Sequence, residues 1–267
     1  MKKPGMVMAV ALMVLGPAVS AWALPVNLPE GIKSKDKGIL LPEGQLPDTV
    51  RISAAGTYDY FSRDMNDYEG EVTGQVAGGK ITISFVHKMD LYVTLGGQMG
   101  TRYNYHDPVF GDEVTFKYTD DFAWGIGMAG TLYEWEEEGW ALFADGGFRR
   151  ASGMDYRYIE DGWGTHYPAD FESMQMDVKW TEWQVALGAS KDLGFATTYF
   201  GVKYSDATLD ARATFYTDMY DLGDDESEDN FGVFVGVVIF PAEGVSLDVC
   251  GRFLDEQAIY VSLTVRV

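Results

Sequence analysis

The sequence predicts an all-β protein, a closed antiparallel transmembrane β-barrel of about ten strands, with eight or twelve strands as alternatives. Three observations favour this fold: apolar residues alternate with period two, the opposite strand face holds glycines, small hydroxyls and isolated charges, and short connections alternate with long ones. Alternation alone fits a soluble β-sandwich equally well. The composition of the second face favours a barrel, because a narrow lumen accommodates small side chains and paired charges while the aliphatic face meets lipid.

The first 23 residues have the layout of a secretory signal peptide. Lys2 and Lys3 precede an apolar run over residues 6–19, and Ala21-Trp22-Ala23 follows as a small-residue cleavage site. We expect cleavage after Ala23. The alternative is an uncleaved anchor, which the run disfavours because a spanning helix needs about 20 apolar residues.

Residues 24–48 are predicted to be a proline-rich periplasmic lead-in that precedes the barrel domain at 49–267. Four prolines, Pro25, Pro29, Pro42 and Pro47, interrupt any strand in this stretch. The alternative for this segment is a plug inserted in the lumen.

Ten strands are expected in the rest of the chain. They span residues 50–61, 70–86, 90–105, 115–134, 139–151, 174–191, 195–207, 229–240, 245–254 and 257–267. Apolar residues that share one face include, in chain order, Ile81, Ile83 and Phe85; Leu91, Val93 and Leu95; Trp124, Ile126 and Met128; Leu142, Ala144 and Phe148; Phe200, Val202 and Tyr204; Phe231, Val233 and Val235; Val245, Leu247 and Val249; and Ile259, Val261 and Leu263. The run at 174–191 changes parity between Trp180 and Trp183, which suggests a bulge or a rise above the bilayer.

The connections between these strands alternate in length. Short ones lie near residues 87–90, 135–139, 191–194 and 241–244, and longer ones near 62–69, 106–114, 152–173 and 208–228. Outer-membrane barrels have tight periplasmic turns and longer external loops, so the short connections are predicted to be periplasmic. The last connection, at Asp255-Glu256, is external in this scheme although it is very short.

The signal peptide, the alternating strands and the ending I-Y-V-S-L-T-V-R-V carry a resemblance to a known family. Over residues 50–267 the chain resembles the small outer-membrane β-barrel proteins of Gram-negative bacteria. The resemblance implies a location in the outer membrane, contacts with its lipid and lipopolysaccharide, and insertion by the barrel-assembly machinery. It leaves the activity open, because that family includes plugs, pores, adhesins and enzymes.

Charge and cysteine content exclude several functions. The chain has 41 Asp+Glu against 20 Lys+Arg, a formal net charge of −21, which argues against a nucleic-acid partner because phosphate binding needs a surplus of basic residues. The single cysteine, Cys250, excludes an intramolecular disulfide and a multi-thiolate metal site. We expect a monomer without a cofactor, apart from loosely bound Ca²⁺ or Mg²⁺.

Ten charged residues are predicted to point into the lumen. They are Asp59, Lys80, Arg102, Asp145, Arg149, Glu182, Lys203, Asp248, Arg252 and Arg266. An unpaired charge is costly in a poorly hydrated tube, so these side chains are expected to form a network of mixed sign.

Two loops contain candidate binding residues. The third long loop holds Tyr156, Tyr158, Trp163 and Tyr167, whose rings could contact a sugar or a host protein or pack within the loop. The fourth holds an acidic run that could collect a divalent cation loosely or simply be solvated. Its residues are Asp221, Asp224, Asp225, Glu226, Glu228 and Asp229.

The sequence favours a structural or narrow small-solute pore role over the other function classes. Binding or adhesion through the external loops is the alternative, and a hydrolase is the least favoured. Ten-stranded outer-membrane proteases use Asp-x-Asp and Asp-x-His pairs, and neither spacing occurs in this chain. No catalytic residue is therefore assigned.

Overall fold

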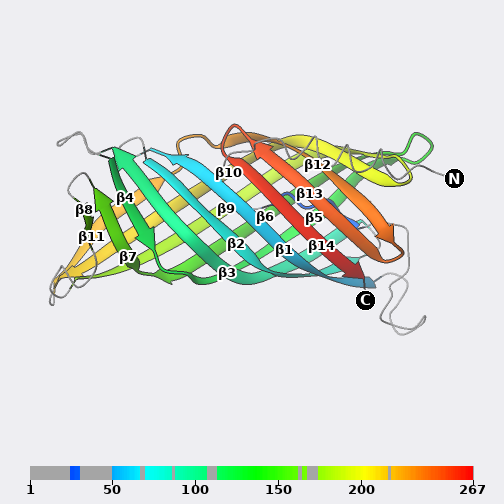
Figure 1. Cartoon of the computed structure of the whole chain (residues 1–267). Coiled ribbons are helices and arrows are strands. Elements are labelled where there is room, and N and C mark those ends of the chain that lie inside the picture. Colours follow the sequence, from blue (N-terminus) through cyan, green and yellow to red (C-terminus); the bar gives the residue numbers. More distant parts are fainter. Residues whose placement is uncertain are drawn as a thin grey trace.

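A computed structural model describes residues 25–30, 50–66, 70–85, 88–106, 113–161, 164–166, 174–215 and 218–266. It confirms a closed antiparallel barrel of ten strands (Figure 1). The barrel wall consists, in chain order, of β1 (Val50–Met65), β2 (Gly70–Phe85), β3 (Met89–His106), β5 (Asp121–Trp135), β6 (Trp140–Met154), β9 (Met174–Asp192), β10 (Ala196–Phe215), β12 (Phe231–Ala242), β13 (Val245–Phe253) and β14 (Gln257–Arg266).

Pairing between the first and last strands closes the wall. β1 pairs with β14 from Ser53↔Arg266 to Ser62↔Gln257, and β1 also pairs with β2 along its whole length. The remaining neighbours follow in chain order around the ring, and β2–β3 pairing completes it. Every ladder is antiparallel, so the backbone polar groups of the wall are satisfied within the sheet, as lipid requires.

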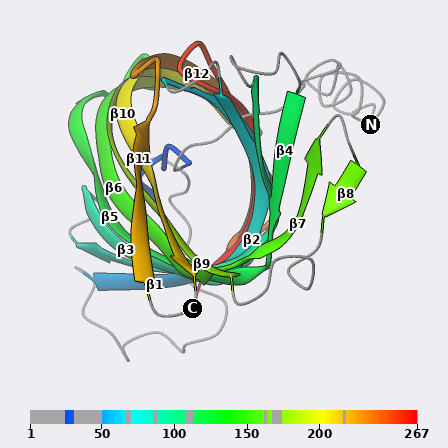
Figure 2. The same cartoon turned by 90° about the vertical axis from the view of Figure 1, so that its left-hand side faces the viewer.

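Four further strands lie at the end of the barrel where the long connections are found (Figure 1). They are β4 (Glu113–Tyr118), β7 (Tyr156–Asp161), β8 (Gly164–His166) and β11 (Asp218–Glu226). β4 pairs with the end of β3 and with β7, which pairs with β8, while β11 pairs with β10. Figure 2 shows β7 and β8 standing beside the ring. The single strand expected at 115–134 is thus divided between β4 and β5.

The outer face of the wall is apolar. On β3, Leu91, Val93 and Leu95 are exposed, and on β5, Ile126 and Met128 are exposed in the same way. A band of exposed aliphatic residues around a closed barrel is the surface that meets hydrocarbon, which places this chain in the outer membrane. Among the described residues, no helix has the length and apolar character needed to cross a membrane.

The parity change in β9 is explained by a rise above the bilayer rather than by a bulge. β9 pairs with β10 without a register shift from Asp192 to Met174. Val178 and Trp180 are buried on the inner side, whereas Val185 and Leu187 are exposed on the outer side. Apolar side chains therefore point outward within the membrane and inward beyond it.

The closed wall predicts heat-modifiable migration on SDS gels. A hydrogen-bonded barrel resists SDS at room temperature and unfolds on boiling, so the refolded protein is expected to migrate differently before and after heating. A chain unfolded in urea and mixed directly with SDS serves as the control. Identical migration of the unboiled and boiled samples would contradict a closed barrel.

Candidate functional site

The structure places nine of the ten predicted lumen charges inside the barrel, each no more than 4% exposed. They are Asp59, Lys80, Asp145, Arg149, Glu182, Lys203, Asp248, Arg252 and Arg266. These residues come from seven of the ten strands of the wall, where alternate positions of a strand face the lumen.

Arg102 is the exception, and the prediction for it was wrong. Its side chain is exposed. Inward-facing Gln98 is followed by inward-facing Thr101, and the β2–β3 register shifts between Thr73 and Gln75. Gly100 lies in this irregularity with φ of +62°, a conformation that glycine adopts without steric cost. The bulge reverses the parity of the residues beyond it, which turns Arg102 outward.

The buried charges in the middle of the lumen form an alternating series, which we call the ionic chain. It begins at Glu182, whose Oε2 lies 3.0 Å from Nη2 of Arg149. Arg149 Nη1 lies 3.3 Å from Oδ2 of Asp59, and Asp59 Oδ1 lies 2.9 Å from Nη2 of Arg252. The series thus crosses the lumen from β9 through β6 and β1 to β13.

The second half of the ionic chain uses the connection between β13 and β14. Arg252 Nε lies 3.1 Å from Oε1 of Glu256, and Glu256 also pairs with Lys203. Lys203 Nζ lies 2.7 Å from Oδ2 of Asp255, which lies 3.2 Å from Nη2 of Arg63. With Glu182, Arg149 and Asp59, the ionic chain has four carboxylates and four cations, so its formal charges cancel.

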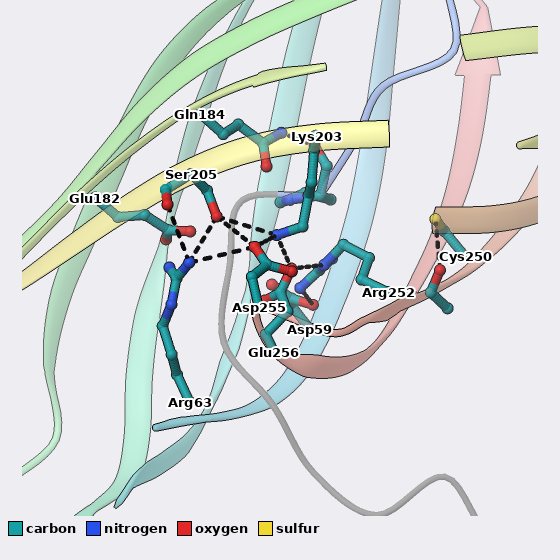
Figure 3. Close-up of polar contacts among 12 residues, drawn as sticks. Asp59, Arg63, Glu182, Gln184, Lys203, Ser205, Cys250, Arg252, Asp255 and Glu256 are labelled. Atoms are coloured by element: carbon teal, nitrogen blue, oxygen red, sulfur yellow. Dashed lines mark hydrogen bonds and ion pairs between the residues drawn. The ribbon is translucent and has the colours of Figure 1, made fainter. Parts of the chain in front are cut away.

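A hydroxyl joins the last three members of the ionic chain. Ser205 Oγ donates to Asp255 Oδ2 at 2.6 Å, and it accepts from Arg63 Nη2 at 2.7 Å and from Lys203 Nζ at 3.3 Å (Figure 3). Charged groups removed from water are tolerated when they are paired and hydrogen-bonded in this way. The arrangement is a structural ion-pair network that ties β1, β10 and the β13–β14 connection together.

Sequence reasoning missed three members of the ionic chain. Arg63 lies beyond the expected end of the first strand, which was placed at residue 61. Asp255 and Glu256 were assigned to a very short external connection and not to the lumen, and both are buried. The sequence did contain a signal for the last two: their connection is very short, although it lies on the side of the barrel where the other connections are long. Ion pairs with Arg63 and Lys203, from strands β1 and β10, hold that connection in the interior.

On the side of the ionic chain toward the short connections, buried acids accept hydrogen bonds from neutral groups. Tyr92 Oη donates to Asp145 Oδ1 at 2.9 Å, and Gln184 Nε2 donates to Asp145 Oδ2 at 3.1 Å. Tyr199 Oη donates to Asp248 Oδ1 at 2.7 Å. Neutral donors therefore satisfy these buried acids, and side chains fill the lumen at this level.

The structure also corrects the prediction for the start of the lead-in. Residues Pro25–Glu30 lie inside the barrel and are all buried, so this part occupies the lumen, as in the alternative that the sequence left open. Prolines exclude a strand, but they do not determine where a non-strand segment packs. Residues 24 and 31–48 lie outside the described part of the chain.

Two apolar clusters lie on either side of the ionic chain. The lower cluster, toward the periplasmic end, contains Val26, Leu28, Phe143, Ala186, Tyr199, Phe234, Val238, Cys250 and Tyr260. The upper cluster, at the external end, contains Phe61, Met65, Val72, Tyr118, Ala123, Ala151, Met154, Val178, Trp180, Ala207 and Leu209. Phe116 of β4 and Ile159 of β7 pack against the upper cluster. Burial raises the pKa of the Tyr118 hydroxyl well above its usual range.

The predicted aromatic binding residues are not brought together among the described residues. Tyr158 is partly buried on β7, where Lys117 donates to its hydroxyl and lies 4.5 Å from the centre of its ring. Tyr156 also lies on β7, but its side chain is outside the described part, as are Trp163 and Tyr167. The proposed sugar or protein site stays a prediction.

The acidic run is divided between the interior and the surface. Asp225 is buried and accepts a hydrogen bond of 2.8 Å from Tyr103, whereas Glu226, Glu228 and Asp229 are exposed. The side chains of Asp221 and Asp224 lie outside the described part. No group of three potential metal ligands occurs among the described residues. The loosely held divalent cation stays a prediction.

Asp229 affects a neighbouring acid at the external rim. The pKa of Asp64 is raised, first by burial and then by the nearby charges of Glu71 and Asp229. Glu71 is the cross-strand partner of Asp64 and accepts a hydrogen bond from Ser62. The negative charges of Asp64, Glu71 and Asp229 therefore repel one another at this part of the rim.

Comparisons with known proteins find similarity to solved structures alone. No protein-family model matches the chain, and no curated protein matches it. Solved structures with a similar fold include the outer-membrane protease OmpT from Escherichia coli, at 12% identity and a TM-score of 0.45, covering 83% of this chain and 97% of that one. The translocator domain of the autotransporter NalP from Neisseria meningitidis has 9% identity and a TM-score of 0.45, covering 84% and 90%.

An outer-membrane channel from Pseudomonas putida F1 is similar at 10% identity and a TM-score of 0.41, covering 85% of this chain and all of that one. The outer-membrane barrel architecture rests on the chain's own closed strand pairing and apolar outer face. The similar structures include a protease, a translocator domain and a channel, and TM-scores below 0.5 assign none of their activities to this chain.

Proposed function

We propose that this protein is a structural outer-membrane barrel with a closed lumen, which supports a small sheet above the membrane. The observation that carries the proposal is the filling of the lumen at three successive levels. From the periplasmic end these are the lower apolar cluster with Pro25–Glu30, the ionic chain, and the upper apolar cluster. A barrel of about eight strands is just filled by its side chains, and here larger residues fill the wider tube of ten.

The ionic chain supports closure because of how it is anchored. Its members reach across the lumen from different strands, and Asp59 bridges Arg149 of β6 and Arg252 of β13. A solute could pass this level only if such pairs separated, and separating buried charges is costly. The same contacts hold the wall together, which suits a structural role better than a permanently open pore.

Planar-bilayer recording tests the proposal directly. The mature protein, starting at Leu24 and refolded in detergent, is expected to produce no stepwise current after insertion, because its lumen is filled. An open porin inserted in the same preparation is the positive control, and protease-protected barrel recovered from the membrane verifies insertion. Reproducible single-channel steps from the inserted protein would contradict a closed lumen and would favour a pore function instead.

A second candidate function is surface binding through the sheet of β4, β7 and β8. The observation that favours it is a partly exposed polar face on this sheet, where Lys117 contacts Tyr158 and lies 3.4 Å from Glu160. Aromatic and charged groups together suit a glycan or a protein partner. A glycan and host-protein array separates this function from a purely structural one.

A further inference from the structure

The segment Pro25–Glu30 is packed in the lumen as tightly as a protein core. Val26 is 0% exposed and Leu28 is 1% exposed. Figure 2, viewed from the external end, shows this segment in blue within the ring of strands. None of its residues takes part in the strand pairing that closes the barrel. The segment is therefore an occupant of the lumen and not a part of its wall.

The segment enters from the periplasmic end and runs inward. The backbone N–H of Glu30 donates to Asp90 Oδ2 at 2.6 Å, and the Glu30 carboxylate lies 3.4 Å from Nε of Arg266. Asp90 is the second residue of β3 and Arg266 the last of β14, so both mark the periplasmic end. At the other end of the segment, the carbonyl of Pro25 accepts from Gln184 Nε2 at 3.3 Å. Gln184 is the inward-facing residue next to Glu182 of the ionic chain.

The lumen matches both the polar and the apolar groups of the segment. Lys80 Nζ donates to Asn27 Oδ1 at 2.7 Å, and Asn27 Nδ2 donates to the Pro25 carbonyl at 2.9 Å. Val26 and Leu28 belong to the lower apolar cluster. The lumen around the segment thus matches a particular order of side chains: an apolar residue, an amide, an apolar residue and, two positions later, a carboxylate that pairs with Arg266.

We propose that the periplasmic half of the lumen is a binding site for a short peptide of this chemistry, and that Pro25–Glu30 occupies it in cis as a removable plug. The ligand class is a Leu- and Pro-containing peptide with apolar side chains flanking an amide and an acid at its outer end.

The tether explains why the site is filled in the intact chain. Residues 31–49, a stretch of 49 − 30 = 19 residues, join the plug to β1. A ligand joined to its receptor by a short linker is held at an effective concentration of about the millimolar range, so even a weak contact stays occupied. Ordering the plug costs conformational entropy that opposes its burial, which makes it separable from a wall that is closed without it.

Peptide binding to a truncated chain tests the proposal. The probe is a peptide of residues 24–31, Leu-Pro-Val-Asn-Leu-Pro-Glu-Gly, with a dye at its C-terminus, and the receptor is the refolded chain starting at residue 31. The truncated chain is expected to bind the probe at least about tenfold more tightly than a control peptide with V26D and L28D, whose buried charges would be unpaired. The full mature chain should bind about a hundredfold more weakly than the truncated chain, because its own tethered plug competes. Equal binding of the two peptides, or of the two receptors, would overturn the proposal.

A second measurement covers the case in which the truncated chain does not refold. In the full mature chain carrying C250A, the V26C thiol is expected to react with a maleimide on the order of 100-fold more slowly in the folded than in the urea-unfolded state, since burial limits access. Q257C, at an exposed position, is the matched control and should react at nearly the same rate in both states. Equally fast labelling of V26C and Q257C in the folded protein would overturn the plug. These assays report on the periplasmic half of the lumen, whereas current reports on the whole lumen, so this inference and the closed-barrel function fail independently.

Discussion

Replacing Asp59 by alanine is expected to lower the free energy of unfolding by about 3–5 kcal/mol, the loss typical of removing one partner from a buried ion pair. Asp59 is 3% exposed and is shared by Arg149 at 3.3 Å and Arg252 at 2.9 Å. The substitution leaves two guanidinium groups facing each other across the lumen without the anion between them. Equilibrium urea unfolding in lipid vesicles, followed by tryptophan fluorescence, measures the change.

Two control variants separate this effect from a general effect of removing an acid. Glu134→Gln removes the partner of Lys88 in a pair with N···O of 3.9 Å, in which the Lys88 side chain is 64% exposed. It is expected to cost less than about 1 kcal/mol, as exposed ion pairs do. Asp59→Asn keeps a hydrogen-bond acceptor near both arginines and should lose less stability than Asp59→Ala. Equal, small losses in all three variants would show that the ionic chain does not hold the wall.

The wall of the barrel could be predicted from the sequence because its physical cause is local. A strand between lipid and lumen must alternate, so Leu91, Val93 and Leu95 identify their strand and its outer face without knowledge of any partner. The inward position of a charge such as Asp145 follows from the same alternation. Long, regular strands carry this parity over many residues, which is why nine of ten lumen charges were located.

The sequence could not predict features that depend on contacts between distant segments. Arg102 was misplaced because one glycine, Gly100, reverses the parity of the strand. Asp255 and Glu256 read as turn residues, and their ion pairs with Arg63 and Lys203 join segments that are distant in the sequence. The plug lacks any periodic pattern, and its position depends on contacts with Lys80, Gln184 and Arg266. Pairing within the ionic chain likewise requires the three-dimensional arrangement of the strands.

Replacing Gly201 by alanine is expected to destabilise the barrel by more than about 3 kcal/mol, beyond the usual 1–3 kcal/mol of overpacking. Gly201 of β10 lies opposite Gly188 of β9, and both face the lumen. A Cβ on Gly201 would lie 2.2 Å from the Leu187 carbonyl oxygen and 2.6 Å from Gly188 Cα. These are backbone atoms of the neighbouring strand, so the clash cannot be relieved by a rotamer change. β9 and β10 would have to separate where they bring Glu182 and Lys203 to the ionic chain.

Gly56→Ala is the matched control, because it adds the same methyl group to a strand glycine without a clash. Gly56 lies on β1, and a Cβ there would have no heavy atom within 4 Å. Its free energy of unfolding is expected to change by no more than about 0.5 kcal/mol, as for surface substitutions elsewhere. Urea unfolding of both variants in the same vesicles gives the comparison, and a Gly201→Ala barrel within 1 kcal/mol of the wild type would contradict the close approach of β9 and β10. A large loss confined to Gly201→Ala would instead show that the glycine pair sets the spacing on which the buried ion pairs depend.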